Sequence, residues 1–532
     1  MCLLNYKKMV ILVLLVLVGT SEAYRYLVVF PMPSRSHHLL GKGVVNHLVD
    51  AGHEVVFVTA FPQDNATLPP NLRELNVSSI IQQLMSSKQT QNAVPKQIKD
   101  LVGKKSNFAD SPDFFILISE FSKSLLENTD FVKFASNPNE KFDAVINEWF
   151  FSEIWSGLAP LFQCPLIWVG STEAHWMNLR LVDEVMNPAH SVDLFSMNKL
   201  PLTFMERAQE LWTIVKRMYT LQMKIIPMER KAFNEMYLPL AAKRRVSMPT
   251  YDEAAYNASL IVLNSHPSMG IPYRFPQNAK HIGGYHLHKN IEPLPKNLQE
   301  LMDRAKNGVI YFSMGSNLQS KDMSEEMKTN FLKMFNELKQ LVIWKIEMKL
   351  ENVPENVHLL EWAPQQSILA HPNLKLFITH GGQLSTTEAI HFGVPLVGIP
   401  VFGDQFVNMQ LAVQKGFAAK VDLEENLDEL LRPAIDEVLN NQRYAINAKK
   451  LSAIYHDRIV PPGAELVHWV EHVVRTKGAA HLRSPALLVP WFQKLYLDLI
   501  AVILVIFVTG IMLIKSLFNV LFKKNNNKFK IN

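Results

Sequence analysis

Residues 377–405 have the sequence FITHGGQLSTTEAIHFGVPLVGIPVFGDQ, and this stretch decides the fold. An apolar strand predicted at 374–378 ends at a His-Gly-Gly turn, a helix is predicted at 385–392, and a second strand at 395–399 ends at another polar turn. Strand, helix and strand in this order form a β-α-β unit, in which the two strands lie parallel. The stretch therefore predicts an α/β fold with its polar turns at the carboxyl edge of a parallel sheet.

The polar residues of this stretch suit a ligand that combines phosphate with sugar hydroxyls. The glycine pair of the first turn lets the backbone approach a ligand closely, and the amides that open the following helix favour a phosphate. Glu388 lies about 12 Å along the helix from His380, where a carboxylate suits a ribose diol. Singly, these residues are explained by a tight turn, a core histidine or a solvated acid, but together they predict one site. Its residues are His380, Gly381, Gly382, Glu388, Asp404 and Gln405.

The same alternation of strand and helix continues on both sides. Further strands are predicted at 26–30, 54–59, 142–147, 165–169, 308–312 and 341–346, and further helices at about 40–52, 323–338 and 404–415. Two doubly wound domains that face each other across a cleft account for this order. We expect an N-terminal α/β domain at 24–288 and a C-terminal α/β domain at 289–480.

Two segments, from about 60 to 130 and from about 175 to 250, are less regular. Their Met, Phe and Leu residues recur at helical spacing, which more often indicates ordinary core. An apolar small-molecule pocket would nevertheless be lined by these segments.

Residues 1–23 have the composition of a secretory signal peptide. Lys7 and Lys8 precede an apolar run, and the small residues Ser21 and Ala23 fit cleavage after Ala23. The alternative is an uncleaved anchor, but ten apolar residues are only half of the ~20 that span a bilayer.

A second apolar segment near the C-terminus is long enough to cross a membrane. Residues 499–514 carry no charge, and their flanks extend the run to a transmembrane helix predicted at 496–516, after a juxtamembrane segment at 481–495. The alternative is a buried core helix, but the segment that follows, a short lysine-rich tail at 517–532, could not cover one. The lysines place this tail in the cytosol, and the signal peptide places the preceding domains in the lumen, which predicts a single-pass type I protein.

Short signals at the surface add detail. The last five residues, KFKIN, have the K-x-K-x-x spacing of a retrieval signal and predict the endoplasmic reticulum membrane. Lysines are common in tails beside membranes, so a chance match is the alternative. Sequons at Asn65, Asn76 and Asn257 predict glycosylated surface positions.

Composition narrows the function classes. Of 532 residues, 48% are hydrophobic and 19% are charged, a globular balance that excludes disorder, collagen and a coiled coil. The net charge of +5 is concentrated in the lysine-rich tail, so it does not predict a nucleic-acid partner. Cys164 is the only cysteine outside the signal peptide, which excludes an internal disulfide and a zinc site of cysteine pairs.

Residues 377–405 resemble the signature of the UDP-glycosyltransferases at every restricted position. The signal peptide, single span and short lysine-rich tail resemble the membrane-bound animal UDP-glucuronosyl- and UDP-glucosyltransferases, and the chain is most similar to the insect members. The resemblance covers nearly the whole chain. It implies the GT-B fold, in which two Rossmann-like domains face each other, the N-terminal one binding the acceptor and the C-terminal one the UDP-sugar.

Two further elements resemble the donor site of this family. In the W-x-P-Q element the resemblance implies that the tryptophan stacks on uracil and that the glutamine contacts the nucleotide, and the segment YFSMGS resembles the loop near the diphosphate. The donor residues thereby implied are Ser313, Gly315, Ser316, Trp362 and Gln365. No D-x-D triplet occurs in the chain, so we expect no metal and no cofactor, with the UDP-sugar as co-substrate.

The resemblance also implies a general base. The family has a histidine in the first loop of the N-terminal domain, and Ser36-His37 matches that position, with the adjacent His38 as the alternative. The base takes the acceptor's proton, and attack from the face opposite UDP gives inversion to a β-glycoside. An acid orients such a histidine, and where many members have aspartate this chain has Glu148, one methylene longer.

Two departures from the vertebrate glucuronosyltransferases bear on the donor. This chain has Asn264 in place of an arginine thought to meet the glucuronate carboxylate, and Leu384 in place of a frequent asparagine. Losing a fixed cation removes the partner of a carboxylate, so UDP-glucose is expected rather than UDP-glucuronate. The acceptor implied is a small lipophilic hydroxyl compound, as in detoxification.

Two other functions stay open at this point. One is a non-catalytic, membrane-anchored binder of a sugar nucleotide or apolar ligand, which the change to Glu148 would permit. The other is a transferase that acts on a lipid such as ceramide. The sequence carries no signal for the oligomeric state.

Overall fold

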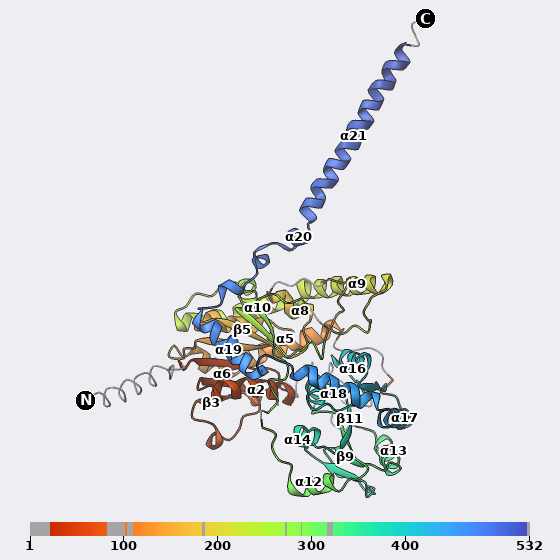
Figure 1. Cartoon of the computed structure of the whole chain (residues 1–532). Coiled ribbons are helices and arrows are strands. Elements are labelled where there is room, and N and C mark those ends of the chain that lie inside the picture. The colour runs from red at the N-terminus through yellow and green to blue at the C-terminus, as the bar shows by residue number, and fades with distance from the viewer. Residues whose placement is uncertain are drawn as a thin grey trace, which may run out of the picture. The chain divides into compact units, whose positions relative to one another are not determined.

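Strands of three to six residues, most of them apolar, form two parallel sheets in this computed structural model (Figure 1). The structure describes residues 22–81, 102–103, 110–182, 187–271, 274–288, 290–316 and 323–528. The first sheet has the order β3 (Leu72–Asn76), β2 (Glu54–Thr59), β1 (Arg25–Val29), β4 (Ala144–Trp149), β5 (Leu166–Gly170), β6 (Leu260–Leu263) and β7 (Ala279–His281). The second has the order β10 (Val357–Leu360), β9 (Leu341–Lys345), β8 (Val309–Ser313), β11 (Leu374–Thr379), β12 (Leu396–Gly398) and β13 (Ala418–Lys420). All strand pairs within the described residues are parallel, as the alternation of strands and helices predicts.

Helices connect the strands and cover both faces of each sheet. In the first half they are α2 (Arg35–Asp50), α5 (Pro112–Leu126), α6 (Thr129–Ser136), α7 (Leu158–Phe162), α8 (Trp176–Leu179), α9 (Phe204–Thr220), α10 (Ile226–Arg244) and α11 (Tyr251–Ala255). In the second half they are α12 (Lys296–Asp303), α13 (Glu325–Asn336), α14 (Gln365–Leu369), α15 (Gln383–Phe392), α16 (Gln405–Gln414), α17 (Leu427–Asn440), α18 (Arg443–His456) and α19 (Pro462–Arg475). The predicted strands and helices are confirmed with bounds within a few residues, except that α2 begins five residues before its predicted start.

Strand periodicity explains the core. Leu27 and Val29 pack into the cluster on one face of the first sheet, while Tyr26 and Val28 pack into the cluster on the other face. Successive strand residues point to opposite faces, so a strand covered by helices on both faces is apolar throughout.

Each sheet has a switch point where the strand order reverses. In the first sheet the chain proceeds from β1 outward through β2 to β3 and then returns to β4 beside β1; in the second, β8 and β11 have the same relation. Loops leave two adjacent strands in opposite directions at such a point, and the crevice between them is where open α/β sheets bind ligands. The loops after β8 and β11 contain five of the predicted donor-site residues, Gly315, Ser316, His380, Gly381 and Gly382. The predicted residues His37, Glu148 and Ser313 lie next to the loops after β1, β4 and β8.

Helix α19 returns from the second domain to the first. Leu466, Val470 and Val473 share a buried cluster with strand β1 and helix α2, and Figure 1 shows α19 beside α2. At Gly463 a β-carbon would lie 2.1 Å from the His47 ring, so only glycine allows this close approach. Residues 462–475, which the sequence places within the C-terminal domain, thus pack on the N-terminal sheet.

The two chain segments that pass between the domains touch each other. The first passes from β7 to α12, and the second from α18 to α19. The carbonyl of Gly283, in the first, accepts hydrogen bonds from Tyr455 Oη at 3.1 Å and from Arg458 Nη2 at 2.8 Å, both near the second. Gly284 has φ +94°, and a β-carbon there would lie 1.6 Å from the Tyr455 hydroxyl, so the junction requires glycine.

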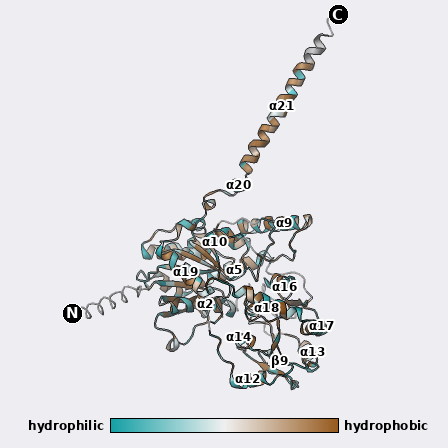
Figure 2. Ribbon diagram, viewed as in Figure 1, coloured by the Kyte–Doolittle hydropathy of each residue, from teal (hydrophilic) through white to brown (hydrophobic). Residues whose placement is uncertain are grey.

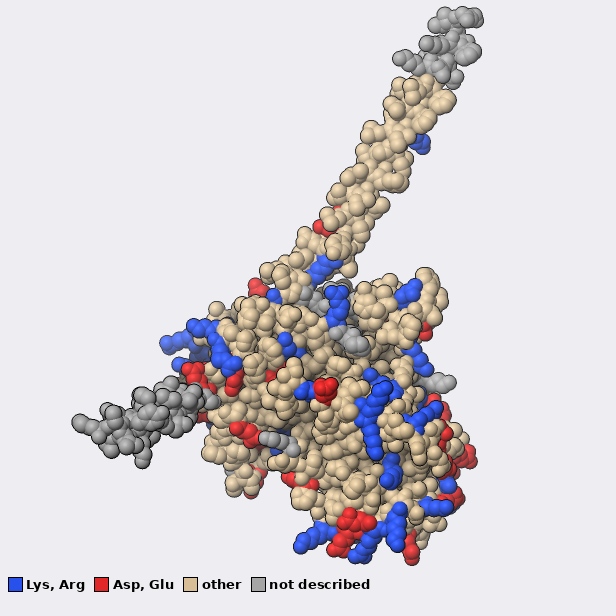
Figure 3. Space-filling model, viewed as in Figure 1, with Lys and Arg blue, Asp and Glu red and all other residues tan. Residues whose placement is uncertain are grey.

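The described chain after Leu482 forms a separate compact unit with helices α20 (Trp491–Lys494) and α21 (Leu497–Lys528). Within α21, the 26 residues Leu497–Phe522 are long and apolar enough to cross a membrane and are not buried against other residues (Figure 2). Figure 3 shows charged side chains of both signs interspersed on the larger unit and few on this helix. The predicted span at 496–516 lies almost wholly within it; residues 1–21 of the predicted signal peptide and 529–532 of the tail lie outside the described residues.

Replacing Leu466 with alanine tests whether α19 belongs to the N-terminal core. Leu466 is fully buried, and we expect Leu466→Ala to cost about 2–5 kcal/mol, seen as a lower Tm. The control Ile446→Ala, on the exposed face of α18, should leave the Tm nearly unchanged. Equal Tm values for both variants would contradict the packing.

Candidate functional site

A cavity of about 610 Å³ lies between the carboxyl edges of the two sheets. Among the described residues that line it are eleven of the thirteen predicted catalytic and donor-site residues: His37, Ser313, Gly315, Ser316, Trp362, Gln365, His380, Gly382, Glu388, Asp404 and Gln405. Of the other two, Glu148 contacts His37, and Gly381 lies within the turn after β11, where its carbonyl accepts a hydrogen bond from Asn408. One cavity therefore unites predictions that come from distant parts of the sequence.

His37 meets a buried carboxylate at the switch point of the first sheet. His37 lies in the first turn of α2, and its Nδ1 contacts Oε1 of Glu148, the next-to-last residue of the neighbouring strand β4. The same oxygen accepts a hydrogen bond from Ser171 Oγ, after β5, and the Phe150 ring packs edge-to-face on His37 at 4.6 Å between centroids. An imidazole that directs Nδ1–H to a carboxylate carries its lone pair on Nε2, so this nitrogen can accept a proton.

His38 lies in a different environment. Its Nδ1 is 2.9 Å from Thr59 Oγ1, its ring stacks on Phe57, and it does not line the cavity among the described residues. Burial lowers the pKa of His38 to about 4, with Lys42 and Arg35 adding to the shift. Of the two adjacent histidines, the structure brings only His37 to Glu148.

The turns after β8 and β11 enclose the ring of His380. A β-carbon would lie 2.6 Å from this ring at Gly315 and 2.5 Å from it at Gly382, so both positions require glycine. Gly381 has φ +80°, and a β-carbon there would lie 2.4 Å from Met409 Cγ. Burial, with the charge of Lys345, lowers the pKa of His380 to about 4, which keeps the imidazole neutral.

Glu388 is held by two glutamine amides. Gln365 Nε2 donates to Glu388 Oε2 at 2.5 Å and Gln366 Nε2 donates to Oε1 at 3.3 Å, while Tyr311 Oη donates to Gln365 Oε1 at 3.2 Å. Burial raises the pKa of Glu388 to about 7, although both amides oppose the shift. This carboxyl group therefore changes charge near neutral pH.

The second polar turn is tied to the first. Gln405 Oε1 accepts from the backbone amides of Val401 and Phe402, at 2.8 and 3.1 Å, so its oxygen stabilises the turn itself. Asn408 Nδ2 donates both to Asp404 Oδ2 at 2.8 Å and to the Gly381 carbonyl at 3.1 Å. Burial raises the pKa of Asp404, against the effects of Asn408 and His37.

The comparisons with known proteins decide the family. The model of the family described as "UDP-glucoronosyl and UDP-glucosyl transferase" matches residues 26–530. UDP-glucosyltransferase 2 of Dactylopius coccus is 32% identical over 515 residues, 96% of each chain. The chain belongs to the UDP-glycosyltransferase family. Its members transfer a sugar from a UDP-sugar, and the cavity of this UDP-glycosyltransferase contains the residues that the family signature contributes.

Relatives of this UDP-glycosyltransferase include both UDP-glucosyltransferases and UDP-glucuronosyltransferases. UDP-glucuronosyltransferase 2B7 of Homo sapiens is 28% identical over 500 residues, 90% of each chain. Among solved structures, the glycosyltransferase VinC in complex with DTDP matches with a TM-score of 0.55 at 15% identity, covering 85% of this chain and all but 1% of that one. A UDP-glucosyltransferase from Polygonum tinctorium matches with a TM-score of 0.53 at 15% identity, over 86% of this chain and 100% of that chain. These neighbours show the GT-B fold.

Sequence reasoning missed several residues of the site. Lys345, at the end of β9, donates to the Gly315 carbonyl at 2.9 Å and pairs with Glu347. Its signal was a lysine in an otherwise apolar strand. Gln383 Nε2 donates to Glu173 Oε1 at 2.7 Å and to the Asn264 carbonyl at 3.1 Å, which joins the two domains across the cleft.

The remaining predicted positions lie away from the cavity. Asn264 is fully buried, its Nδ2 donates to the Ser171 carbonyl at 3.3 Å, and it is not among the described lining residues. Asn76 and Asn257 are exposed, and the side chain of Asn65 lies outside the described part of the chain. No cluster of three or more His, Cys, Asp or Glu side chains suited to a metal occurs within the described residues.

Proposed function

We propose that this UDP-glycosyltransferase moves glucose from UDP-glucose to a hydroxyl of a small lipophilic acceptor, with inversion and with His37 as general base. The observation that carries the proposal is the contact between His37 Nδ1 and the buried Glu148 carboxylate. His37 lines a cavity whose other side is lined by residues of the family's donor signature. A histidine oriented by an acid is a recurrent arrangement for proton abstraction.

In the proposed step, His37 Nε2 takes the proton of the acceptor hydroxyl. The acceptor oxygen forms a bond to the anomeric carbon while the bond from that carbon to the UDP oxygen breaks, so UDP leaves with the electron pair. Glu148, fully buried, stabilises the imidazolium that forms. The neutral ring of His380 and the first amides of α15 donate to the diphosphate without a metal or cofactor.

The donor is proposed to lie along the C-terminal wall. Trp362, 57% exposed, offers its face to uracil, and Gln365 meets the nucleotide beside it. Glu388 binds the ribose diol, while the second turn, Asp404 and Gln405, binds hydroxyls of the transferred sugar. The diphosphate then lies by Ser313, Gly315 and Ser316, next to His380.

Glucose is favoured over glucuronate because the cavity offers little positive charge to the carboxylate of glucuronate. Lys345 is the only lysine or arginine among its described lining residues, and it is already paired with Glu347. Leu384 lines the cavity as an apolar group, whereas Asn264 is buried behind it and acts at most indirectly. The glucosyltransferase relative from Dactylopius coccus supports the same donor.

The acceptor is proposed to lie along the N-terminal wall, which is aromatic and apolar. Its lining includes Leu39, Leu40, Phe114, Phe150, Phe151, Leu194 and Phe195. Such a surface selects lipophilic compounds, as in detoxification or conjugation. The C-terminal helix supports an anchored enzyme, which we place in the endoplasmic reticulum membrane as a single-pass type I glycoprotein with lumenal domains.

Replacing each of the two adjacent histidines tests the base. His37→Ala should lower kcat by about 10²–10⁴ because proton abstraction is lost, while the Kd for UDP-glucose stays the same. His38→Ala is the matched control and should retain most of its activity. Assays of UDP release with phenols, flavonoids, steroids and ceramide measure both variants; full transfer by His37→Ala contradicts the proposal, and UDP-glucose binding without transfer by the unaltered protein favours a non-catalytic binder.

The pH dependence of donor binding tests Glu388. Below a pKa of about 7 the carboxyl is protonated and loses an acceptor for the ribose diol, so affinity for UDP-glucose should rise about tenfold from pH 6 to pH 8. Calorimetric titration measures this; the diphosphate of UDP-glucose is a diester and does not itself titrate there. Glu388→Gln, which resembles the protonated acid, should bind UDP-glucose weakly and equally at both pH values. If the affinity of this variant still rises with pH as it does in the unaltered protein, the role of Glu388 is contradicted.

A side-by-side assay decides the donor. With one acceptor, kcat/KM for UDP-glucose should exceed that for UDP-glucuronate by at least about tenfold, because Lys345, the one lysine or arginine among the described lining residues, is already paired and does not offset desolvation of the uronate. Faster turnover with UDP-glucuronate would refute the preference.

A further inference from the structure

The segment 187–202, here named the 187–202 loop, presents two apolar side chains to the acceptor side of the cavity. It precedes α9, and Leu194 and Phe195 both line the cavity. No regular secondary structure holds the loop, so its shape depends on side-chain bonds. Those bonds are concentrated on three charged residues, all nine-tenths or more buried: Asp193 in the loop, and Glu210 and Arg217 on α9.

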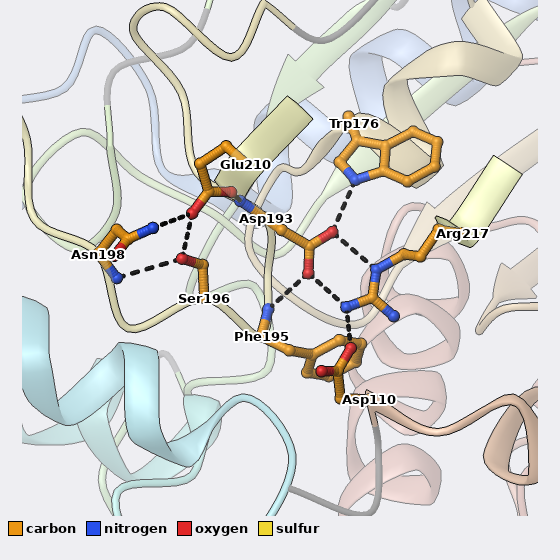
Figure 4. Close-up of polar contacts among 8 residues, drawn as sticks. All are labelled: Asp110, Trp176, Asp193, Phe195, Ser196, Asn198, Glu210 and Arg217. Atoms are coloured by element: carbon orange, nitrogen blue, oxygen red, sulfur yellow. Dashed lines mark hydrogen bonds and ion pairs between the residues drawn. The ribbon is translucent and has the colours of Figure 1, made fainter. Parts of the chain in front are cut away.

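Asp193 accepts hydrogen bonds at both carboxylate oxygens (Figure 4). Arg217 binds it in a two-pronged manner, with Nε 2.9 Å from Oδ2 and Nη2 2.7 Å from Oδ1. The Trp176 indole donates to Oδ2 at 2.8 Å, and the backbone amide of Phe195 donates to Oδ1 at 3.0 Å. The ion pair therefore fixes the backbone at the residue whose ring lines the cavity.

Glu210 fixes the loop on either side of Phe195. Its Oε2 accepts from the backbone amide of Asp193 at 2.8 Å, and its Oε1 accepts from Ser196 Oγ and from Asn198 Nδ2, the latter at 2.8 Å. These bonds close the loop against α9, as Figure 4 shows.

Contacts continue from this anchor to the base. The Arg217 guanidinium lies over the Phe195 ring at 4.9 Å, and the Phe195 ring is 5.9 Å from that of Phe151. Phe151 lies 4.9 Å from Phe150, the ring that packs on His37. These rings form a continuous series of contacts from Phe195 to His37.

The loop also touches the other domain. Gln410 Nε2, on α16, donates to the carbonyls of Met197 and Asn198 at 2.9 and 3.2 Å. Helix α16 begins at Gln405, in the turn assigned to the donor sugar. The acceptor wall and the donor-sugar turn are therefore joined through one loop.

The energetics favour a positioning role over a purely stabilising one. Burying two charges costs solvation that an apolar pair would not lose, so a buried ion pair adds little net stability. Burial alone would raise the pKa of Asp193, but Arg217 and the hydrogen bonds lower it below its ordinary value. The pKa of Arg217 is raised, because the effect of Asp193 exceeds the opposing effect of burial. Both groups stay ionised, and the bidentate geometry defines one orientation of the loop.

We infer that the Asp193–Arg217 pair, with Glu210, is a positioning device that sets the acceptor wall, and that Leu194 and Phe195 determine which lipophilic acceptors fit. This rests on the proposed transfer to a lipophilic acceptor. Acceptors with a flat apolar face, large enough to reach from His37 to Phe195, are the class that the wall selects.

Steady-state kinetics with small and large acceptors test the inference. Phe195→Ala should raise the acceptor KM for a large acceptor about tenfold, with the KM for UDP-glucose unchanged. Arg217→Lys keeps the charge but loses the bidentate fork, and should raise the same KM several-fold and shift the ranking of acceptors by size. Arg230→Lys, in the exposed pair with Asp252, is the matched control and should change neither KM.

Two outcomes overturn the inference. One is an unchanged acceptor ranking in both Phe195→Ala and Arg217→Lys; the other is an equal loss for all acceptors together with a raised donor KM, which indicates general disruption. Phe195→Leu, which keeps an apolar side chain, should fold and restore part of the affinity. If the unaltered enzyme transfers to no acceptor, the proposed function fails, and calorimetric binding of 1-naphthol to the unaltered protein and Phe195→Ala still tests the wall.

Discussion

A carboxylate buried away from water must find hydrogen-bond donors, and the position of Glu148 means that the two strands beside β4 supply them. Glu148 is 1% exposed at the end of β4, and its donors, His37 and Ser171, follow the adjacent strands β1 and β5. Only the strand order β1-β4-β5 brings these loops together. The contact therefore depends on the order of these three strands, and the burial that makes the carboxylate costly to leave unpaired also orients the His37 ring.

The C-terminal sheet has different residues at its own switch point. Its switch point, between β8 and β11, presents a neutral histidine between glycines instead of a histidine in contact with a carboxylate. In the proposed reaction, two copies of one topology thus carry complementary chemistry: one edge would accept a proton, while the other would donate hydrogen bonds to a phosphate. The cavity needs both edges, which explains why its residues are spread from His37 to Gln405.

The sequence predicted most of this arrangement because its strong signals are local. Buried parallel strands are continuous apolar runs, and the glycine turn and capped helix at 380–393 occupy adjacent positions in the chain. It missed β3 and β10, whose edge positions leave residues such as Glu74 and His358 half-exposed, and β6, β7 and β13, which are only three or four residues long. It also missed Lys345, Asn408 and Gln383, because their partners are brought near by folding alone, and Asn264 lies behind the cavity for the same reason.

The junction at Gly283 sets how the two domains can move. Two covalent links between rigid bodies define an axis, and here the links are hydrogen-bonded to each other through the Gly283 carbonyl, so the axis is confined to one small region. We therefore expect any opening of the cleft to be a rotation about this pivot, with little sliding or twisting. In such a rotation, the displacement of an atom grows with its distance from the pivot. The hydrogen bonds of Gln383 and Gln410 across the cleft would therefore lengthen in proportion to their distances from Gly283.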